Sequence, residues 1–344
     1  MVDLPAEVAL PAEVALPAKL DLPAKLDLPA EVDLPKHPSA AGSRLLGQAV
    51  LVAGVRRVAV IGAGKNAGKT TALLALCAAA SVEAMAVGLV SVGLDGEARD
   101  AWSDASKPQV RLEKDGWMVT ALPFATAAGR ALQIVATLPI ATALGPTVLA
   151  RARAPLHVQL CGIGHRQDLL AAIAALAAQV PLVLVDGAYH RQMAAHPQVA
   201  QAIVVAVGAI AAPSDQDAVA LAVPTLRALL VGLAGDQPES AATYVVSGAL
   251  TDTVLARCRS KSVLVRDSSR ILLSQAGWAA ADRQGITVVA SHAVPVRAVV
   301  SNPWRQPGAA IDAAAFLAQV RAAVNVCGGA GVPVIDVVAG LRAD

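Results

Sequence analysis

The sequence predicts an α/β protein built on a mostly parallel, doubly wound sheet. From Arg56 onward, apolar runs of four to seven residues alternate with alanine-rich segments of helical length. Runs that are apolar throughout are typical of strands buried on both faces, so we expect helices on both sides of the sheet. One run leads into a glycine-rich turn, and a set of hexapeptide repeats precedes the part of the chain expected to fold.

The apolar runs indicate ten strands. They lie near residues 57–61, 86–92, 156–161, 181–185, 202–207, 243–246, 262–266, 286–290, 297–301 and 332–336. Residues 109–121, QVRLEKDGWMVTA, predict an inserted β-hairpin that turns at Asp115 and Gly116. In open α/β sheets ligands bind at the carboxyl ends of the strands, so functional residues are expected at that edge.

A phosphate-binding loop, the Walker A motif of phosphate-loop (P-loop) proteins, is predicted by residues 57–71, RVAVIGAGKNAGKTT. Here a buried strand runs into a glycine-rich turn and then a helix. The residues expected to bind the phosphates are Gly64, Lys65, Asn66, Ala67, Gly68, Lys69, Thr70 and Thr71. Small residues let backbone N–H groups converge on phosphate oxygens, while Lys69 supplies a positive charge for the β- and γ-phosphates. The Thr70 hydroxyl can ligate Mg²⁺.

The loop departs from the pattern GxxxxGK[ST] at one position, because Ala63 stands where the first glycine is expected. Alanine fits there if its φ stays negative or if Gly62 takes the special conformation instead. Lys65 has two interpretations of equal weight, which are direct contact with phosphate and a solvated loop lysine.

Two carboxylates are expected to complete the site. Asp186 ends the apolar strand in PLVLVDGAYHR, the place of a second Mg²⁺-organising acid in phosphate-loop proteins. A simple helix cap is the alternative for Asp186. Asp95 follows the strand near 86–92 and would coordinate Mg²⁺ through water or position an attacking water, or else be a loop acid beside a tight turn. Lys69, Asp95 and Asp186 are thus the expected catalytic residues of a nucleoside triphosphatase.

Residues 1–44 are expected to form a low-complexity tail and linker, and residues 45–344 a P-loop NTPase domain. Proline recurs at every sixth position from Pro5 to Pro35. Prolines at this spacing break helices, and the hexads bury too little apolar surface to offset the entropy of ordering them, so a flexible tail is expected. The alternative is a partner-docking arm or a short β-solenoid.

Composition narrows the classes of function. The net charge is +2 with scattered basic residues, and aromatic residues make up 2% of the chain, which disfavours nucleic acid and membrane surfaces as partners. The apolar run at 202–213 is shorter than the roughly 20 residues that span a bilayer. The N-terminus lacks the pattern of a secretory signal, and four widely spaced cysteines are expected to be buried free thiols, so we expect a cytoplasmic location.

The loop GAGKNAGKTT resembles that of the molybdopterin-guanine-dinucleotide adapter proteins and of dethiobiotin synthetase. Over residues 55–340, segments such as SVGLDGE, LVDGAYHR and VSNPW are similar to a P-loop NTPase family associated with gene clusters for cobalamin-dependent lysine 5,6-aminomutase and ornithine aminomutase. This resemblance implies ATP-dependent maintenance or reactivation of such a mutase. The chain departs from the family at Ala67, where serine is usual, and in its N-terminal repeats.

Three functions fit these observations. The first is a Mg²⁺-dependent NTPase, using ATP or GTP, that serves as an assembly, maintenance or reactivation factor for a protein partner, with a homodimer as one arrangement. The second is a small-molecule kinase or ATP-dependent ligase resembling dethiobiotin synthetase, with residues 95–165 forming the acceptor pocket. The third is a nucleotide-binding module without turnover. No [NT]KxD sequence follows a later strand, which favours ATP over GTP.

Overall fold

The computed structural model describes residues 37–92, 99–100, 103–106, 110–187, 192–235, 243–305 and 311–344. Its main sheet contains β1 (Arg57–Gly62), β2 (Val87–Ser91), β6 (Trp117–Ala121), β7 (Leu132–Thr142), β8 (Gly145–Ala152), β10 (Leu182–Asp186), β11 (Ala202–Gly208), β17 (Val296–Asn302), β18 (Val334–Asp336) and β19 (Leu341–Ala343). A smaller sheet contains β12 (Thr243–Val246), β14 (Ser262–Asp267) and β16 (Thr287–His292). Three short pairs are β3 (Arg99–Asp100) with β4 (Ser103–Ser106), β5 (Val110–Leu112) with β9 (Leu156–Val158), and β13 (Leu250–Thr251) with β15 (Ile271–Leu272).

The helices of the described chain are α1 (Ala40–Val50), α2 (Lys69–Val82), α3 (Leu122–Ala127), α4 (Arg166–Ala177), α5 (Asp215–Leu229), α6 (Asp252–Leu255), α7 (Gln275–Gln284) and α8 (Ala313–Val326). Short 3₁₀ turns are η1 (Gly129–Ala131), η2 (Gln192–Ala195), η3 (Ala209–Ala211) and η4 (Ser268–Arg270). Among the residues that the structure describes, no helix is both long enough and apolar enough to cross a membrane.

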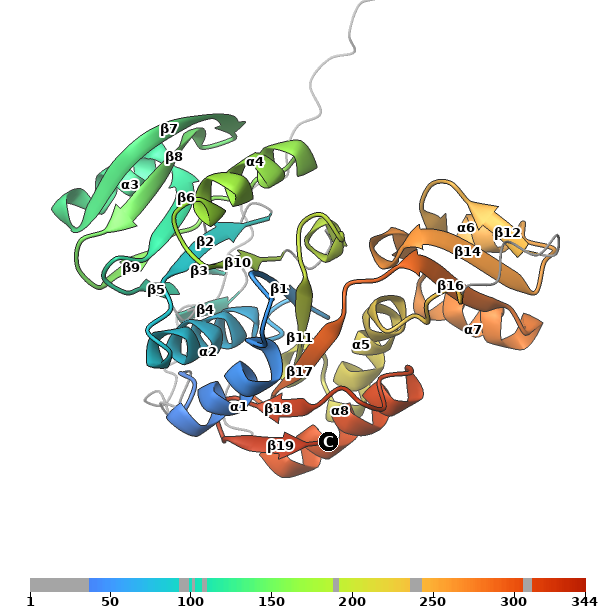
Figure 1. The fold of residues 1–344 in the computed structure, drawn as a ribbon. Coiled ribbons are helices and arrows are strands. Elements are labelled where there is room, and N and C mark those ends of the chain that lie inside the picture. Colours follow the sequence, from blue (N-terminus) through green and yellow to red (C-terminus); the bar gives the residue numbers. More distant parts are fainter. Residues whose placement is uncertain are drawn as a thin grey trace, which may run out of the picture. The chain divides into compact units, whose positions relative to one another are not determined.

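The main sheet has the strand order β19-β18-β17-β11-β1-β10-β2-β6-β8-β7 (Figure 1). Every neighbouring pair from β18 to β6 is parallel, and the pairs β18–β19, β6–β8 and β7–β8 are antiparallel. The prediction of a mostly parallel α/β sheet is therefore confirmed. The strand β1, which leads into the predicted phosphate loop, lies near the middle of the sheet between β10 and β11.

Two apolar cores cover the two faces of the main sheet. One contains Leu46 of α1 and Leu73 of α2, packed with Val58 and Val60 of β1. The other contains buried residues of α4, α5 and α8, packed with the alternate side chains of β1. This alternation is the period of two that a strand imposes, and it explains why strands covered by helices on both faces are apolar at every position. The doubly wound prediction is confirmed.

The apolar pattern suggested a single sheet, but the strands belong to several sheets. Three of the expected strands form the separate parallel sheet β12-β14-β16, which has its own apolar core. A fourth, β9, pairs antiparallel with β5. Apolar runs predict burial of a strand but contain no information on which strand it pairs with, so the pattern could not separate the sheets.

The prediction of a hairpin over residues 109–121 is wrong in its pairing. The turn exists, with Asp115 at φ 68° and the N–H of Gly116 donating to the Glu113 carbonyl at 3.0 Å. The strands on its two sides separate, because β5 pairs with β9 whereas β6 joins the main sheet beside β2 and β8. The inserted hairpin is formed further along the chain by β7 and β8.

The three-stranded sheet contacts the rest of the fold through α5 and α7. The Arg227 guanidinium donates two hydrogen bonds of 2.7 Å to the Asp282 carboxylate and lies 4.2 Å from the ring centre of Trp278. The Trp278 Nε1 donates to the Pro224 carbonyl at 3.3 Å. A bidentate ion pair combined with an arginine stacked on an aromatic ring fixes both distance and orientation. Both sheets belong to one compact unit of the chain.

The helix α1 begins earlier than the sequence suggested. A linker was expected up to residue 44, whereas Ser39 caps a helix that starts at Ala40, accepting a hydrogen bond from the Gly42 N–H at 3.0 Å. The serine also donates to the Val337 carbonyl at 3.3 Å. Gly42 lies directly against Val337, which lets the helix approach the chain after β18 closely. The hexapeptide repeats lie outside the described residues.

Replacing Gly42 with alanine is expected to destabilise the fold by about 1–3 kcal/mol, because overpacking of a tight backbone contact forces the elements apart. The new Cβ would lie 2.1 Å from the Val337 carbonyl oxygen and 2.5 Å from its carbon. Urea denaturation measures the change. Gly248→Ala is the matched control, since a Cβ there meets nothing within 4 Å. Equal stability of the two variants would contradict the close docking of α1.

Candidate functional site

The predicted phosphate loop leaves the central strand at the edge where the parallel strands end. Val60 of β1 is paired with Asp186 of β10, and Gly62 is paired with Ala206 of β11. The N–H of Ala63 still donates to the Ala206 carbonyl at 2.8 Å, so the chain turns away from the sheet only after this residue. The loop is thus placed where ligands of open parallel sheets bind.

The loop closes into α2 through two residues with left-handed backbone conformations. Asn66 has φ 59°, and Gly68 has φ 96° as the N-cap of the helix. A glycine is required at the second position, because a side chain strains a backbone with φ in this range. Gly68 offers no side chain to cap the helix, and the first turn of α2 contains no acidic residue. The N–H groups and positive dipole end of α2 therefore suit an anion.

The ends of β11 and β17 contact the loop. A Cβ on Gly208 would lie 2.6 Å from Ala67 Cα, so the end of β11 touches the loop backbone. A Cβ on Gly68 would lie 2.7 Å from the amide nitrogen of Asn302, the last residue of β17. Gly208 and Asn302 are themselves paired across the two strands. The loop therefore packs against two paired strand ends, the kind of support that a preformed anion site requires.

The side chain of Lys69 runs back over the loop. Its Cγ and Cδ lie 3.0 and 3.1 Å from the position that a Cβ on Gly62 would take. Gly62 is the last residue of β1, so the lysine stem crosses the mouth of the loop at the carboxyl end of the strand. Lys69 and Thr70 are both partly exposed at the start of α2, whereas Lys65 is exposed and Ala67 is buried. The aliphatic part of the Lys69 side chain therefore lies against the end of β1, beside the loop.

Asp186 ends a strand, as predicted, and that strand, β10, pairs with β1, which the sequence did not predict. Asp186 is 9% exposed, and the following residue, Gly187, donates its N–H to the Val60 carbonyl at 2.9 Å. On its other side Asp186 is paired with Ser91, which ends β2. The Ser91 hydroxyl is buried and has no hydrogen-bond partner within the described part of the chain. Asp186 therefore ends the strand beside β1, while Lys69 and Thr70 begin the helix that follows β1 and its loop.

Three more predicted phosphate-binding residues lie in the loop or in the first turn of α2, where their exposure differs. Gly64 is buried in the loop, Asn66 is half-buried, and Thr71 is 6% exposed in the first turn of α2. Asp95 lies outside the described residues, so its predicted role stays a prediction. The sequence analysis did not identify Asn302, Gly208 and Ser91 as site residues. They lie beside the loop or beside Asp186 only because their strands pair there. The segment VSNPW, which includes Asn302, was noted only as part of the family resemblance.

The residues present fit a nucleoside triphosphate with Mg²⁺. The loop and the start of α2 offer backbone N–H groups, one ammonium group and one hydroxyl, which are the donors that bind polyphosphate. Thr70 and Asp186 supply the hydroxyl and carboxylate oxygens that Mg²⁺ prefers.

Burial makes at least two of the four cysteines poor nucleophiles. All four are free. Burial raises the pKa of Cys327 to about 11 and also raises the pKa of Cys258, so these thiols stay protonated at neutral pH. A protonated thiol is neither a good nucleophile nor a good metal ligand.

A scan against models of protein families and a search of curated proteins found no match to this sequence. A solved structure with partial likeness is the signal recognition particle receptor FtsY from Elizabethkingia anophelis. The identity is 11%, the alignment covers 81% of this chain and 71% of that one, and the TM-score is 0.27. A likeness this low carries no argument about fold or function, so the site is interpreted from its own geometry.

Proposed function

We propose that this protein binds a nucleoside triphosphate with Mg²⁺ at residues 62–71 and hydrolyses it. The observation that supports the proposal most strongly is the left-handed Gly68 at the start of α2, together with the Lys69 stem that crosses back over Gly62. Backbone N–H groups of the loop and Lys69 would hold the β- and γ-phosphates, and Thr70 and Asp186 would hold the metal. Catalysis of this kind depends on positioning and charge stabilisation.

Binding is tested by isothermal titration with ATP and GTP, each with and without Mg²⁺. We expect one nucleotide per chain and tighter binding with the metal, because Mg²⁺ links the phosphates to Thr70 and Asp186. At a hundredfold excess over its Kd, the nucleotide would stabilise the fold by about 2.7 kcal/mol. The lack of an [NT]KxD motif after a later strand favours ATP. The ratio of the two measured affinities decides between ATP and GTP.

Replacing Asp186 with asparagine is expected to reduce ATP hydrolysis and Mg²⁺ affinity on the order of 10- to 100-fold, as for residues that orient a metal and its water. The amide has nearly the same shape but lacks the negative charge, so the fold is retained. Hydrolysis is measured as phosphate release over a range of Mg²⁺ concentrations. Asp344→Asn is the control, since Asp344 is an exposed residue at the C-terminus. An unchanged metal dependence in Asp186→Asn would contradict the assignment.

The sequence resemblance extends the proposal to a protein partner. We propose a cobalamin-dependent aminomutase, whose assembly, maintenance or reactivation would be driven by the nucleotide state of this protein. Slow intrinsic hydrolysis that accelerates when lysine 5,6-aminomutase is added would support this role. Rapid hydrolysis that is indifferent to the mutase would contradict it. ADP formation that requires a small-molecule acceptor would instead favour a kinase or ligase, and binding without turnover would favour a nucleotide-binding module.

A further inference from the structure

A second cationic site shares no lining residue with the phosphate loop. A cavity of about 270 Å³ is lined by Arg166, His196, Pro197, Gln198, Arg266, Asp267, Arg270 and His292. Three arginines and two histidines therefore surround a single carboxylate. This site does not depend on the proposed nucleotide function, because it shares no residue with the loop at 62–71.

The cavity forms where the carboxyl edge of the three-stranded sheet faces connecting segments of the main sheet. Asp267 and His292 are the last residues of the parallel neighbours β14 and β16, and they are paired across these strands. From the main sheet, His196 follows β10 through η2, and Arg166 begins α4. The carboxyl edge of a parallel sheet is the usual place for a ligand, and here one such edge faces segments from the other sheet.

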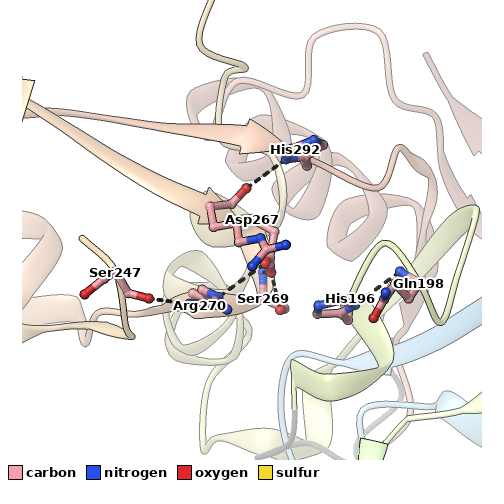
Figure 2. Close-up of polar contacts among 8 residues, drawn as sticks. His196, Gln198, Ser247, Asp267, Ser269, Arg270 and His292 are labelled. Atoms are coloured by element: carbon pink, nitrogen blue, oxygen red, sulfur yellow. Dashed lines mark hydrogen bonds and ion pairs between the residues drawn. The ribbon is translucent and has the colours of Figure 1, made fainter. Parts of the chain in front are cut away.

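The single acid of the cavity is already neutralised. Asp267 is 2% exposed, and its Oδ1 accepts hydrogen bonds from the N–H and the hydroxyl of Ser269. The Nε of Arg270 lies 3.3 Å from Asp267 Oδ2, and the same guanidinium donates to the Ser247 carbonyl (Figure 2). Asp267 therefore orients Arg270 and leaves little negative charge to attract a cation.

The other two arginines of the cavity have no ion-pair partner among the residues that the structure describes. These two, Arg166 and Arg266, are both exposed. The carbonyl of Arg266 accepts a hydrogen bond from Nδ1 of His292 at 3.3 Å, which holds the end of β16 beside it. Like charges at a cavity repel one another, so this arrangement is more favourable when an anion lies between them.

His196 presents a donor to the same cavity. Its Nδ1 accepts a hydrogen bond from the Gln198 N–H at 3.1 Å, so the neutral ring has its proton on Nε2. Burial lowers the pKa of His196, and Arg166, Arg270 and Arg266 lower it further while Asp267 opposes them. The ring is thus neutral at pH 7, with one N–H available. Figure 2 shows His196 beside the group formed by Asp267, Ser269 and Arg270.

We propose that this cavity binds a small metabolite through a phosphate or carboxylate group, with Arg166, Arg266, Arg270 and the Nε2–H of His196 as donors. Guanidinium groups match both anions, because their planar N–H groups bind two oxygens at once. The cavity volume leaves room for a few carbon atoms beyond the anionic group, which suits a small metabolite.

The test uses the full chain and two probes, glycerol 3-phosphate and succinate, titrated calorimetrically at 0.15 M salt to screen weak surface charges. Both probes are also titrated into Lys69→Ala, in which the phosphate loop has lost its ammonium group. We expect at least one probe to bind with the same affinity to the wild type and to Lys69→Ala. The probe that binds more tightly identifies the anionic group.

Arg166→Gln and Arg266→Gln are each expected to weaken that binding about 5- to 10-fold, the effect of losing one charge-assisted hydrogen bond at an exposed site. Arg283→Gln, an exposed arginine of α7 outside the cavity, removes the same charge and should leave the affinity unchanged. Melting temperatures without probe verify that all variants are folded. Failure of both probes to bind at millimolar concentrations would overturn the proposal, as would loss of binding in Lys69→Ala or equal losses in Arg283→Gln.

Discussion

Lys69→Ala is expected to weaken Mg²⁺-nucleotide binding on the order of 100- to 1,000-fold. The stem of Lys69 lies over Gly62, where its ammonium group can reach phosphates held by the loop. Charged hydrogen bonds contribute about 1.5–3 kcal/mol each, so two of them near the lower value contribute about 3–4 kcal/mol. Each 1.4 kcal/mol is a factor of ten in affinity. Isothermal titration with ATP and GTP measures the loss.

Lys114→Ala is the matched control for this variant, since Lys114 is exposed at the turn between β5 and β6 and carries the same charge. It should bind nucleotide like the wild type. The remaining N–H groups cannot replace a lost positive charge beside a polyphosphate. If Lys69→Ala kept its affinity within twofold of the control, the assignment of the phosphate site to this loop would be refuted.

Gly208→Ala is expected to reduce nucleotide affinity by about tenfold or more, because the new methyl group would displace the loop. Its new Cβ would lie 2.6 Å from the Ala67 Cα and 2.9 Å from the Ala67 carbonyl carbon and oxygen. Both partners are backbone, so the loop must move away from β11. Displacing a binding group by about 1 Å can cost as much as a hundredfold in function. The same overpacking should lower the stability of the ligand-free protein by about 1–3 kcal/mol.

Gly232→Ala serves as the control, because a Cβ at that position meets nothing within 4 Å. Affinity is measured by titration, and stability by urea denaturation in the absence of nucleotide. The informative quantity is the affinity of the folded Gly208→Ala protein, which separates a displaced loop from simple unfolding. Wild-type affinity in that variant would mean that the contact between β11 and the loop does not position the phosphates.

Local sequence patterns were sufficient to predict the central part of the fold. The order of strand, loop and helix at residues 57–71 requires no knowledge of distant residues, because glycines, a lysine and flanking apolar runs define it within one segment. Asp186 could likewise be placed at a strand end from its own segment. Its position beside β1 was beyond the pattern, since strand order depends on tertiary contacts.

The parts that sequence reasoning missed all depend on pairing between distant segments. Nothing in residues 243–292 distinguishes strands of a second sheet from strands of the first, because both are short and apolar. Asn302 and Gly208 support the loop only because β17 and β11 end beside it. The cationic cavity draws residues from four separate segments, and none of them forms a motif by itself.

Hydrogen exchange of the backbone N–H groups with and without Mg²⁺-ATP or Mg²⁺-GTP tests the central claim most directly. If the loop binds polyphosphate through its backbone, peptides covering residues 62–71 should become protected by nucleotide in the wild type and remain unprotected in Lys69→Ala. Nucleotide binding that leaves these peptides unprotected, or that protects only other parts of the chain, would contradict the account.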